Sequence, residues 1–251
     1  MSMSPYRLTG PIGTDATLGL IVLQVDETIE HDFRRLFPGP QVALYVSRIP
    51  SGAALTPGTI AQMEIDLPQA ASLLPPAAAF DVIGYACTSG TTLIGHEKVA
   101  ALIAQNATTR AVSDPLTASI AALRTLDVGS IGIVSPYIAD VAAPIRAAFQ
   151  AAGFTVPATV SFGEEIEARV ARIDPLSIRD AALEVGAAKG VEAVFLSCTN
   201  LRTLDIIADL EARLGLPVIS SNQALAWHMA RTAGAGLTTH PPGMLFRTKG
   251  A

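Results

Sequence analysis

Residues 81–89 read Asp-Val-Ile-Gly-Tyr-Ala-Cys-Thr-Ser, and residues 192–200 read Glu-Ala-Val-Phe-Leu-Ser-Cys-Thr-Asn. Each stretch has an acidic residue, a short apolar run typical of a buried strand, and a Cys-Thr pair that opens a helix. The cysteines of the two stretches, Cys87 and Cys198, are the only ones in the chain. Because matched thiols in two half-domains can face each other across one small molecule, this pattern indicates a two-thiol enzyme.

Apolar runs alternate with helical patterns on both sides of Cys87. Thr56 and Pro57 fit the start of a helix, and Pro38-Gly39-Pro40 ends an earlier one. For the first half we expect strands at 17–23, 42–46, 80–86 and near 111–112, and helices at 29–36, 56–74, 97–105 and 115–126.

The second half repeats this order around Cys198. Gly19-Leu-Ile-Val is matched by Gly132-Ile-Val, and Ser113-Asp114 falls near the equivalent of Ser220-Ser221. Here we expect strands at 130–134, 154–160, 193–197 and 216–219, helices at 139–152, 176–189, 203–214 and 223–233, and a loop from 234 onward.

Strands that alternate with helices in this way predict an α/β fold of parallel sheets with right-handed crossovers. The repeat predicts two pseudo-symmetric lobes, residues 17–127 and 128–235, with terminal extensions at 1–16 and 236–251; the prediction allows the C-terminal elements of the lobes to be exchanged. Ligands bind such sheets beyond the carboxyl ends of the strands. We therefore expect the active site between the lobes.

Composition narrows the class of protein. Half of the residues are hydrophobic and only 16% are charged, as in a well-buried α/β enzyme. The net charge of −5 and the absence of Lys or Arg runs predict no nucleic-acid partner, and no segment predicts a membrane span. The first residues lack the apolar core of a signal peptide, so we expect a cytoplasmic protein. A homo-oligomer is compatible with this composition.

The position of the cysteines predicts their chemistry. A cysteine between a strand and a helix meets free backbone N–H groups and the positive end of the helix dipole, which lowers the thiol pKa. With Thr88, Ser89, Thr199 and Asn200, the same N–H groups form a site for a carboxylate. One thiolate would remove a proton alpha to that carboxylate, and the opposite thiol would return a proton on the other face.

Each of these residues also has a purely structural interpretation. The threonines are typical helix N-caps, and a cysteine is often a small buried apolar residue or half of a disulfide. Asp26 either caps the next helix or contacts the substrate or Cys87, and Tyr137 is either a surface aromatic or a donor to a carboxylate. No metal-ligand spacing and no phosphate-binding loop is found, so we expect no metal and no cofactor.

These motifs resemble the aspartate/glutamate racemase superfamily over residues 17–235. The segments 84–91, 135–137 and 196–200 carry the resemblance, which is strongest to the branch of maleate cis-trans isomerase, arylmalonate decarboxylase and ectoine-utilisation racemase-like proteins. It implies a cofactor-free enzyme with two flavodoxin-like lobes. It also implies that Thr88, Ser89 and Tyr137 hold a carboxylate, together with backbone N–H groups near Cys198 and Thr199.

The resemblance implies different roles for the two cysteines in different members. In maleate isomerase the residue at Cys87 is the nucleophile and that at Cys198 the proton donor, whereas both act as acid and base in racemases. Arylmalonate decarboxylase has glycine at the position of Cys87, which argues against decarboxylation here. Asp26, and less certainly aligned Glu167, stand where maleate isomerase has amides. Two acids disfavour maleate and favour a substrate with an ammonium group.

The leading hypothesis is therefore a cofactor-independent, racemase-type isomerase that acts on a small amino-acid derivative or carboxylic acid through Cys87 and Cys198. The alternatives are maleate cis-trans isomerisation, decarboxylation of a malonate-type acid with Cys198 as sole proton donor, and a cytoplasmic protein that only binds a small carboxylate.

Overall fold

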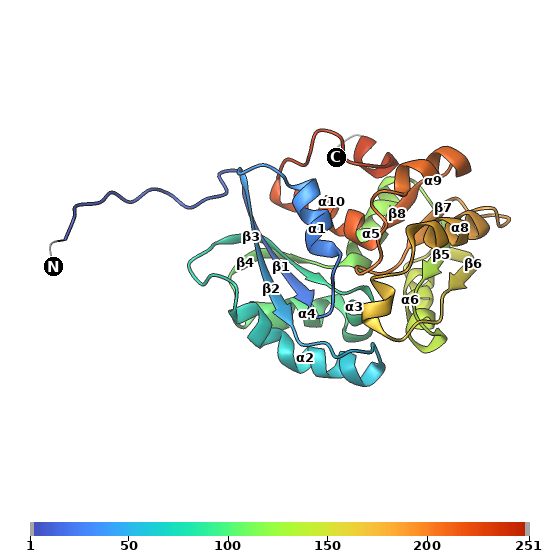
Figure 1. Ribbon diagram of the computed structural model, residues 1–251, viewed down its shortest axis with the longest axis horizontal. Helices are drawn as coiled ribbons and strands as arrows, with labels where there is room; N and C mark the ends of the chain where they lie inside the picture. The colour runs from blue at the N-terminus through green and yellow to red at the C-terminus, as the bar shows by residue number, and fades with distance from the viewer. Residues whose placement is uncertain (1–2, 249–251) are drawn as a thin grey trace.

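The computed structural model describes residues 3–248, in which strands and helices alternate from Ala16 onward (Figure 1). The first half contains β1 (Ala16–Leu23), α1 (Ile29–Leu36), β2 (Val42–Ile49), α2 (Pro57–Ser72), β3 (Phe80–Ala86), α3 (Thr88–Ile94), α4 (His96–Ala104), β4 (Thr109–Ser113) and α5 (Pro115–Thr125).

The second half contains β5 (Ser130–Ser135), α6 (Ala139–Ala151), β6 (Thr155–Ser161), α7 (Glu167–Val170), α8 (Pro175–Gly186), β7 (Ala193–Leu196), α9 (Ile207–Leu214), β8 (Val218–Ser220), α10 (Ser221–Ala233) and the 3-10 turn η1 (Met244–Arg247).

The strands form two four-stranded sheets in which neighbouring strands run parallel. The strand order is β2-β1-β3-β4 in one sheet and β6-β5-β7-β8 in the other, so each half of the chain builds the same topology. This confirms the predicted α/β fold of two pseudo-symmetric lobes, each a parallel sheet flanked by helices. Within the first sheet Leu23 pairs with Ile49 and Val22 with Ala86, which brings the carboxyl ends of these strands to one edge.

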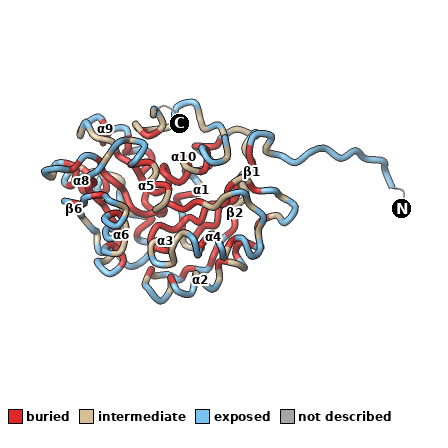
Figure 2. Tube along the Cα trace, turned by 180° about the vertical axis from the view of Figure 1, so that it is seen from behind, coloured by how far each residue is buried: buried red, intermediate tan, exposed pale blue. Residues whose placement is uncertain are grey.

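The central strands are mostly apolar, as expected for parallel strands covered by helices on both faces. Residues 18 and 20–23 of β1 are at most 3% exposed, and β5 and β7 are buried along their whole length. Figure 2 shows the buried chain running through the sheets, with exposed segments along the outer helices. The edge strand β6 instead alternates between exposed and less exposed residues, as expected for a strand with one face toward solvent.

The helices α5 and α10 cover the sheet of the opposite half. Although α10 follows β8, its Met229 packs on β3, where a Cβ at Gly84 would lie 2.7 Å from Met229 Sδ. In turn Ala122 and Leu123 of α5 join Phe195 in the apolar cluster of the second sheet. Glycine at position 84 is thus explained by the close approach of α10. The lobe boundaries at 127 and 235 stay predictions.

The structure differs from the sequence-based expectation at several element ends. A separate helix, α3, begins directly after Cys87, and residues 199–206 are irregular where a helix was expected from 203. Two short elements were not expected, α7 after the loop that follows β6 and η1 in the C-terminal tail. Hydrophobic periodicity places long elements well and single turns poorly.

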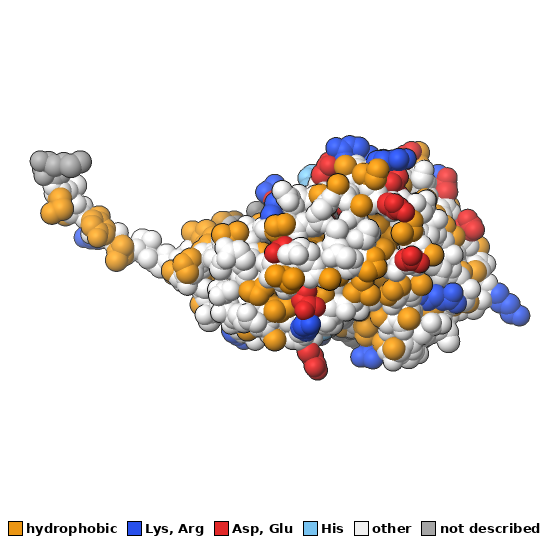
Figure 3. Space-filling model, turned by 90° about the horizontal axis from the view of Figure 1, so that it is seen from below, with side chains coloured by type: hydrophobic (Ala, Val, Ile, Leu, Met, Phe, Trp, Pro, Cys, Tyr) orange, Lys and Arg blue, Asp and Glu red, His pale blue; other side chains and the backbone are white. Residues whose placement is uncertain are grey.

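Residues 3–14 form an arm with neither helix nor strand, and it extends away from the body (Figures 1 and 3). On the face seen in Figure 3, acidic and basic side chains are interspersed among apolar and other polar ones. Within residues 3–248, no helix combines the length and apolar character that a membrane crossing requires.

Candidate functional site

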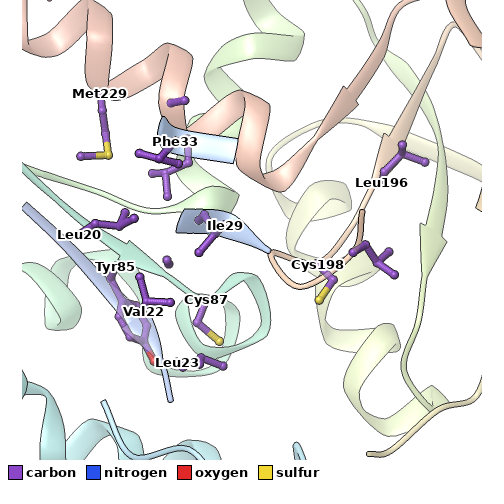
Figure 4. Close-up of a cluster of buried hydrophobic side chains, with 14 of the residues drawn as sticks. Leu20, Val22, Leu23, Ile29, Phe33, Tyr85, Cys87, Leu196, Cys198 and Met229 are labelled. Atoms are coloured by element: carbon purple, nitrogen blue, oxygen red, sulfur yellow. The ribbon is translucent and has the colours of Figure 1, made fainter. Parts of the chain in front are cut away.

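The two cysteines lie at equivalent carboxyl ends, Cys87 directly after β3 and Cys198 two residues after the end of β7. Both thiols are free and buried, with 2% and 3% of the residue exposed. In Figure 4 they sit on neighbouring loops, with both sulfur atoms turned toward the region between these loops. The structure therefore places the pair on one shared site, as the repeat predicts.

Cys87 is the N-cap residue of α3. Its sulfur accepts a hydrogen bond from the Gly90 backbone N–H at 3.1 Å and lies 3.7 Å from the Ser89 hydroxyl. Burial nevertheless raises the pKa of the Cys87 thiol to about 11, because the two hydrogen bonds only partly offset desolvation and the carboxylates of Glu167 and Asp26 raise it further.

Cys198 has a different environment. Its backbone φ of +154° lies outside the usual range for a residue with a side chain, a strain that folded proteins tend to retain at functional positions. The sulfur lies 3.0 Å from the Tyr137 hydroxyl and accepts from the Asn200 N–H at 3.2 Å. Burial and then the nearby Glu167 raise the pKa of this thiol well above its ordinary value.

The expectation that both thiols have lowered pKa values is therefore wrong. Only Cys87 starts a helix, whereas α9 begins nine residues after Cys198. Even at Cys87, one short helix end does not outweigh the loss of hydration and two nearby carboxylates. Both thiols are neutral in this closed state, so a thiolate has to be formed as part of the reaction.

The two Cys-Thr turns are bonded to each other across the lobes. The Thr88 hydroxyl lies 2.9 Å from the Ser221 hydroxyl, which in turn accepts from the Cys198 N–H at 3.1 Å. The Thr199 hydroxyl donates to the Ala86 carbonyl at 3.3 Å. These bonds hold one turn at a set position relative to the other. Ser221, the first residue of α10, was not predicted as a site residue, although the Ser220-Ser221 match to Ser113-Asp114 was a signal.

A buried polar cluster adjoins Cys198. The Tyr137 hydroxyl donates to Glu167 Oε1 at 2.7 Å, and the Asn200 amide donates to Glu167 Oε2 at 3.1 Å. Asn200 also accepts from the Glu27 N–H at 2.8 Å, which ties this cluster to the loop after β1. Burial raises the pKa of Glu167, and the hydrogen bonds from Tyr137 and Asn200 offset only part of this increase. Tyr137 is thus a buried site residue, and the surface alternative is wrong.

Asp26 caps the helix after β1 and leaves one oxygen free. Its Oδ1 accepts from the backbone N–H groups of Thr28 and Ile29 at 2.8 and 2.9 Å. Its buried Oδ2 has no hydrogen-bond partner. The Thr199 hydroxyl lies close enough to lower the pKa of Asp26, but it donates its proton to the Ala86 carbonyl. Burial raises the pKa of this carboxyl overall. The structural interpretation is correct for Oδ1, and Oδ2 remains available to a ligand.

Two loops close over this cluster from opposite lobes. Ala54, after β2, forms an isolated antiparallel bridge with Ile166, before α7. The Glu167 N–H donates to the Ala53 carbonyl at 3.0 Å, and the Leu55 N–H donates to the Glu165 carbonyl at 3.4 Å. The cysteines and the nearby acids are almost inaccessible in this arrangement, in which the bridge joins the two lobes next to Glu167.

Gly90 to alanine is expected to disable the site while the protein still folds. An added Cβ would lie 2.7 Å from the Tyr85 hydroxyl and 2.8 Å from Cys87 Sγ, so these buried groups have to shift. The displaced thiol should lower turnover by about a hundredfold, with a stability loss of about 1–3 kcal/mol. Thermal unfolding and a turnover assay measure the two effects. The control is Gly58→Ala, whose Cβ meets only Thr56 Oγ1 at 3.8 Å; full activity in the Gly90 variant would contradict this prediction.

Asp32 to asparagine is expected to stabilise the protein at neutral pH. Burial raises the pKa of Asp32 to about 6, so the folded state holds its proton more tightly than the unfolded state. The contribution of neutral Asp32 to the free energy of unfolding is fully present below pH 4, and it is lost as the pH rises through 6. Asparagine keeps the bond from Asn222 Nδ2, 2.9 Å in this structure, and carries no charge. The gain should be about 2–3 kcal/mol at pH 7 and vanish near pH 4.

Urea unfolding at both pH values measures this gain, with the exposed Asp15→Asn as control. An equal change in the free energy of unfolding at both pH values would show that removing the charge is not its cause.

Comparison with known proteins agrees with this geometry. The profile of the arylmalonate decarboxylase family matches residues 65–246. Arylmalonate decarboxylase of Bordetella bronchiseptica is 32% identical over 92% of this chain and 96% of its own length, and maleate isomerase of Nocardia farcinica is 24% identical over 93% and 96%. The structure of a maleate isomerase variant from Pseudomonas putida S16 with maleate superimposes with a TM-score of 0.83 at 23% identity, covering 93% of this chain and 98% of that one.

Proposed function

The chain belongs to the arylmalonate decarboxylase family, and within it we propose a cofactor-independent isomerase of the racemase type that acts at the carbon alpha to a carboxylate. The observation that carries this proposal is the pair of buried thiols, Cys87 and Cys198, at equivalent strand ends of two lobes and turned toward one region. A single thiol suffices to protonate one face of a carbanion. A pair at matching positions allows a proton to leave one face and return to the other.

In this mechanism one thiolate takes the alpha proton and the electron pair moves into an enediolate. The opposite thiol then gives its proton to the other face, so the product differs only in configuration. Hydroxyl and N–H groups around Thr88 and Ser89 would stabilise the enediolate, an effect worth several kcal/mol in related chemistry, while the single hydroxyl proton of Tyr137 is donated to Glu167. Thr199, whose hydroxyl is bonded to the Ala86 carbonyl, would contribute its backbone N–H group, and Asn200 would hold Cys198 Sγ and Glu167 in place.

The unpaired carboxylate oxygen of buried Asp26 supports an amino-acid derivative as substrate. Asp26 Oδ2 is an acceptor without a donor, and a buried acceptor of this kind costs about 1–3 kcal/mol until it is paired. A substrate ammonium or amide N–H would pair with it, whereas a second carboxylate would be repelled unless Asp26 were protonated. A small amino acid or N-acylated amino acid therefore fits better than a dicarboxylate.

Two other reactions of the family remain as alternatives with their own signatures. Cis-trans isomerisation of maleate would use Cys87 as a nucleophile that adds to the alkene, with Cys198 as proton donor. Decarboxylation of a malonate would need only Cys198, and would persist in a Cys87→Gly variant. A protein that only binds a small carboxylate would turn over none of these compounds.

The test is proton NMR of the protein in D2O with aspartate, glutamate, diaminobutyrate, its N-acetyl forms, maleate and phenylmalonate. Loss of an alpha-proton signal from an amino acid, absent in the Cys87→Ser, Cys198→Ser double variant, is the expected result. Formation of fumarate from maleate or carbon dioxide from phenylmalonate, without alpha exchange, would replace the proposal with one of the alternatives. No reaction across the panel would argue against the proposed substrate class.

A further inference from the structure

Glu167 is a buried carboxylate with a direct line of contacts to one thiol. It is 1% exposed, its Oε1 accepts from the Tyr137 hydroxyl at 2.7 Å, and that hydroxyl lies 3.0 Å from Cys198 Sγ. Around Cys87 the contacts are of another kind, a backbone N–H and the Ser89 hydroxyl. The two thiols thus differ in that only Cys198 contacts a side chain bonded to a buried carboxylate, a difference that the sequence repeat does not predict.

The proton positions in this line follow from the donors available. A tyrosine hydroxyl has one proton, and an ionised carboxylate only accepts. If the Tyr137 proton points to Glu167, the proton between Tyr137 and Cys198 has to belong to the thiol. The resting order is therefore Cys198 S–H to Tyr137 oxygen, and Tyr137 O–H to Glu167 carboxylate.

We propose that Glu167 accepts the proton of Cys198 through the Tyr137 hydroxyl, and so generates the thiolate that begins the reaction. This inference rests on the proposed role of Cys198 as an acid/base thiol. The thiol proton moves to Tyr137 while the Tyr137 proton moves to Glu167. Tyr137 ends as it began, Glu167 is neutral and Cys198 carries the charge, so atoms and charge balance without another reactant.

The charges around the line favour a transfer of this kind over loss of a proton to water. The titratable groups near Glu167 and Cys198 are Asp26 after β1 and Tyr137 after β5, and Cys87 at α3 interacts with Glu167. A second negative charge in this buried cluster is costly. Moving one charge from Glu167 to Cys198 adds none, and Asn200 stabilises both ends, with its amide on Glu167 and its N–H on the sulfur.

The same residue links thiol ionisation to closure of the site. Glu167 follows Ile166, which pairs with Ala54 of the other lobe, and the Glu167 N–H donates to the Ala53 carbonyl at 3.0 Å. The bridge that closes the site thus holds the backbone of the residue that accepts the proton. Opening the bridge would remove this restraint on Glu167, so the relay would operate only while the bridge holds Glu167 against Tyr137.

The first test measures the thiol without any substrate. Since the chain has two cysteines, labelling with [3-13C]cysteine gives two signals, which a Cys87→Ala variant assigns. In Glu167→Gln the pKa of Cys198 should fall relative to the native protein, because a carboxylate that raises it has been removed. The control is Glu165→Gln, an exposed acid two residues away. An unchanged Cys198 titration in Glu167→Gln would refute an interaction between these groups.

The second test is the pH profile of kcat/KM for alpha-proton exchange. With Glu167 the transition state carries as many protons as the resting enzyme, so the native rate should be flat through neutral pH and fall in acid as Glu167 becomes protonated. In Glu167→Gln and Tyr137→Phe the thiol proton has to be lost to solvent, and the rate should rise about tenfold per pH unit. A Glu167→Gln profile as flat as the native one would overturn the relay, even if its thiol is easier to ionise.

The two tests separate this inference from the proposed function. If no compound exchanges its alpha proton, the proposed function fails, while the NMR titration still decides whether Glu167 acts on Cys198. If exchange occurs and both Glu167→Gln and Tyr137→Phe behave as native, the function stands and the relay does not.

Discussion

Serine in place of Cys198 is expected to lower the rate of alpha-proton exchange by about a thousandfold or more. A serine hydroxyl is a far weaker acid than a thiol, so it neither gives nor takes the proton at a useful rate, and general acid/base groups contribute about 10²–10⁴-fold. The replacement is nearly isosteric at a position with 3% exposure, so the fold should persist. Exchange measured by proton NMR in D2O and a thermal unfolding curve report the two properties separately.

Cys87→Ser provides the comparison that identifies the reaction. A two-base racemase loses turnover with either serine, because each proton position is used once per reaction. A decarboxylase that needs only Cys198 would retain activity with serine or glycine at position 87. Near-native racemisation in either serine variant would rule out the two-thiol mechanism.

Sequence reasoning identified the elements on which the cysteines lie. The strands before Cys87 and Cys198 are short, largely apolar and followed by polar residues, and helices cover both faces of such strands. The structure builds both halves with one strand order, and this order brings the two carboxyl ends to a common site. A local pattern repeated twice was therefore sufficient for the architecture.

The contacts that complete the site join segments far apart in the chain. Ser221 reaches Thr88 over 133 positions and Cys198 over 23, and Asn200 reaches Glu167 over 33. No periodicity encodes such pairs. The exchange of α5 and α10 between the sheets, which determines where Ser221 lies, also depends on packing rather than on any local signal.

The prediction that both thiols have lowered pKa values is wrong for a related reason. A helix end is visible in a sequence, whereas the depth of burial and the approach of Glu167 and Asp26 are not. Here these two effects dominate, and both raise the pKa values. After Cys198 the chain makes an irregular turn, in which Asn200 uses its side chain to bind Glu167 and the loop after β1. The repeat thus holds for the sheets and fails at the two Cys-Thr turns.

Asparagine at position 26 is expected to reverse the preference of the site between an ammonium and a carboxylate. Its Oδ1 can keep the bonds to the N–H groups of Thr28 and Ile29, 2.8 and 2.9 Å in the native protein. The other atom changes from Oδ2, an acceptor without a partner, to a donor. A substrate ammonium would lose a buried ionic partner, a loss of about 2–5 kcal/mol. We expect kcat/KM for the amino-acid substrate to fall by about a hundredfold or more.

The same change should improve both stability and the use of dicarboxylates, which no general damage to the protein would do. Burial raises the pKa of Asp26, so its charge costs stability at neutral pH, and asparagine removes that cost while keeping the helix cap. Maleate, or another diacid from the panel, should then gain relative to the amino acid because a donor replaces a repelling carboxylate. Competition between the two substrates in one NMR sample measures the ratio directly, with the exposed Asp140→Asn as control. Equal losses for both substrates would mean that Asp26 orients Cys87 or the loop after β1, and that it does not select the charge of the substrate.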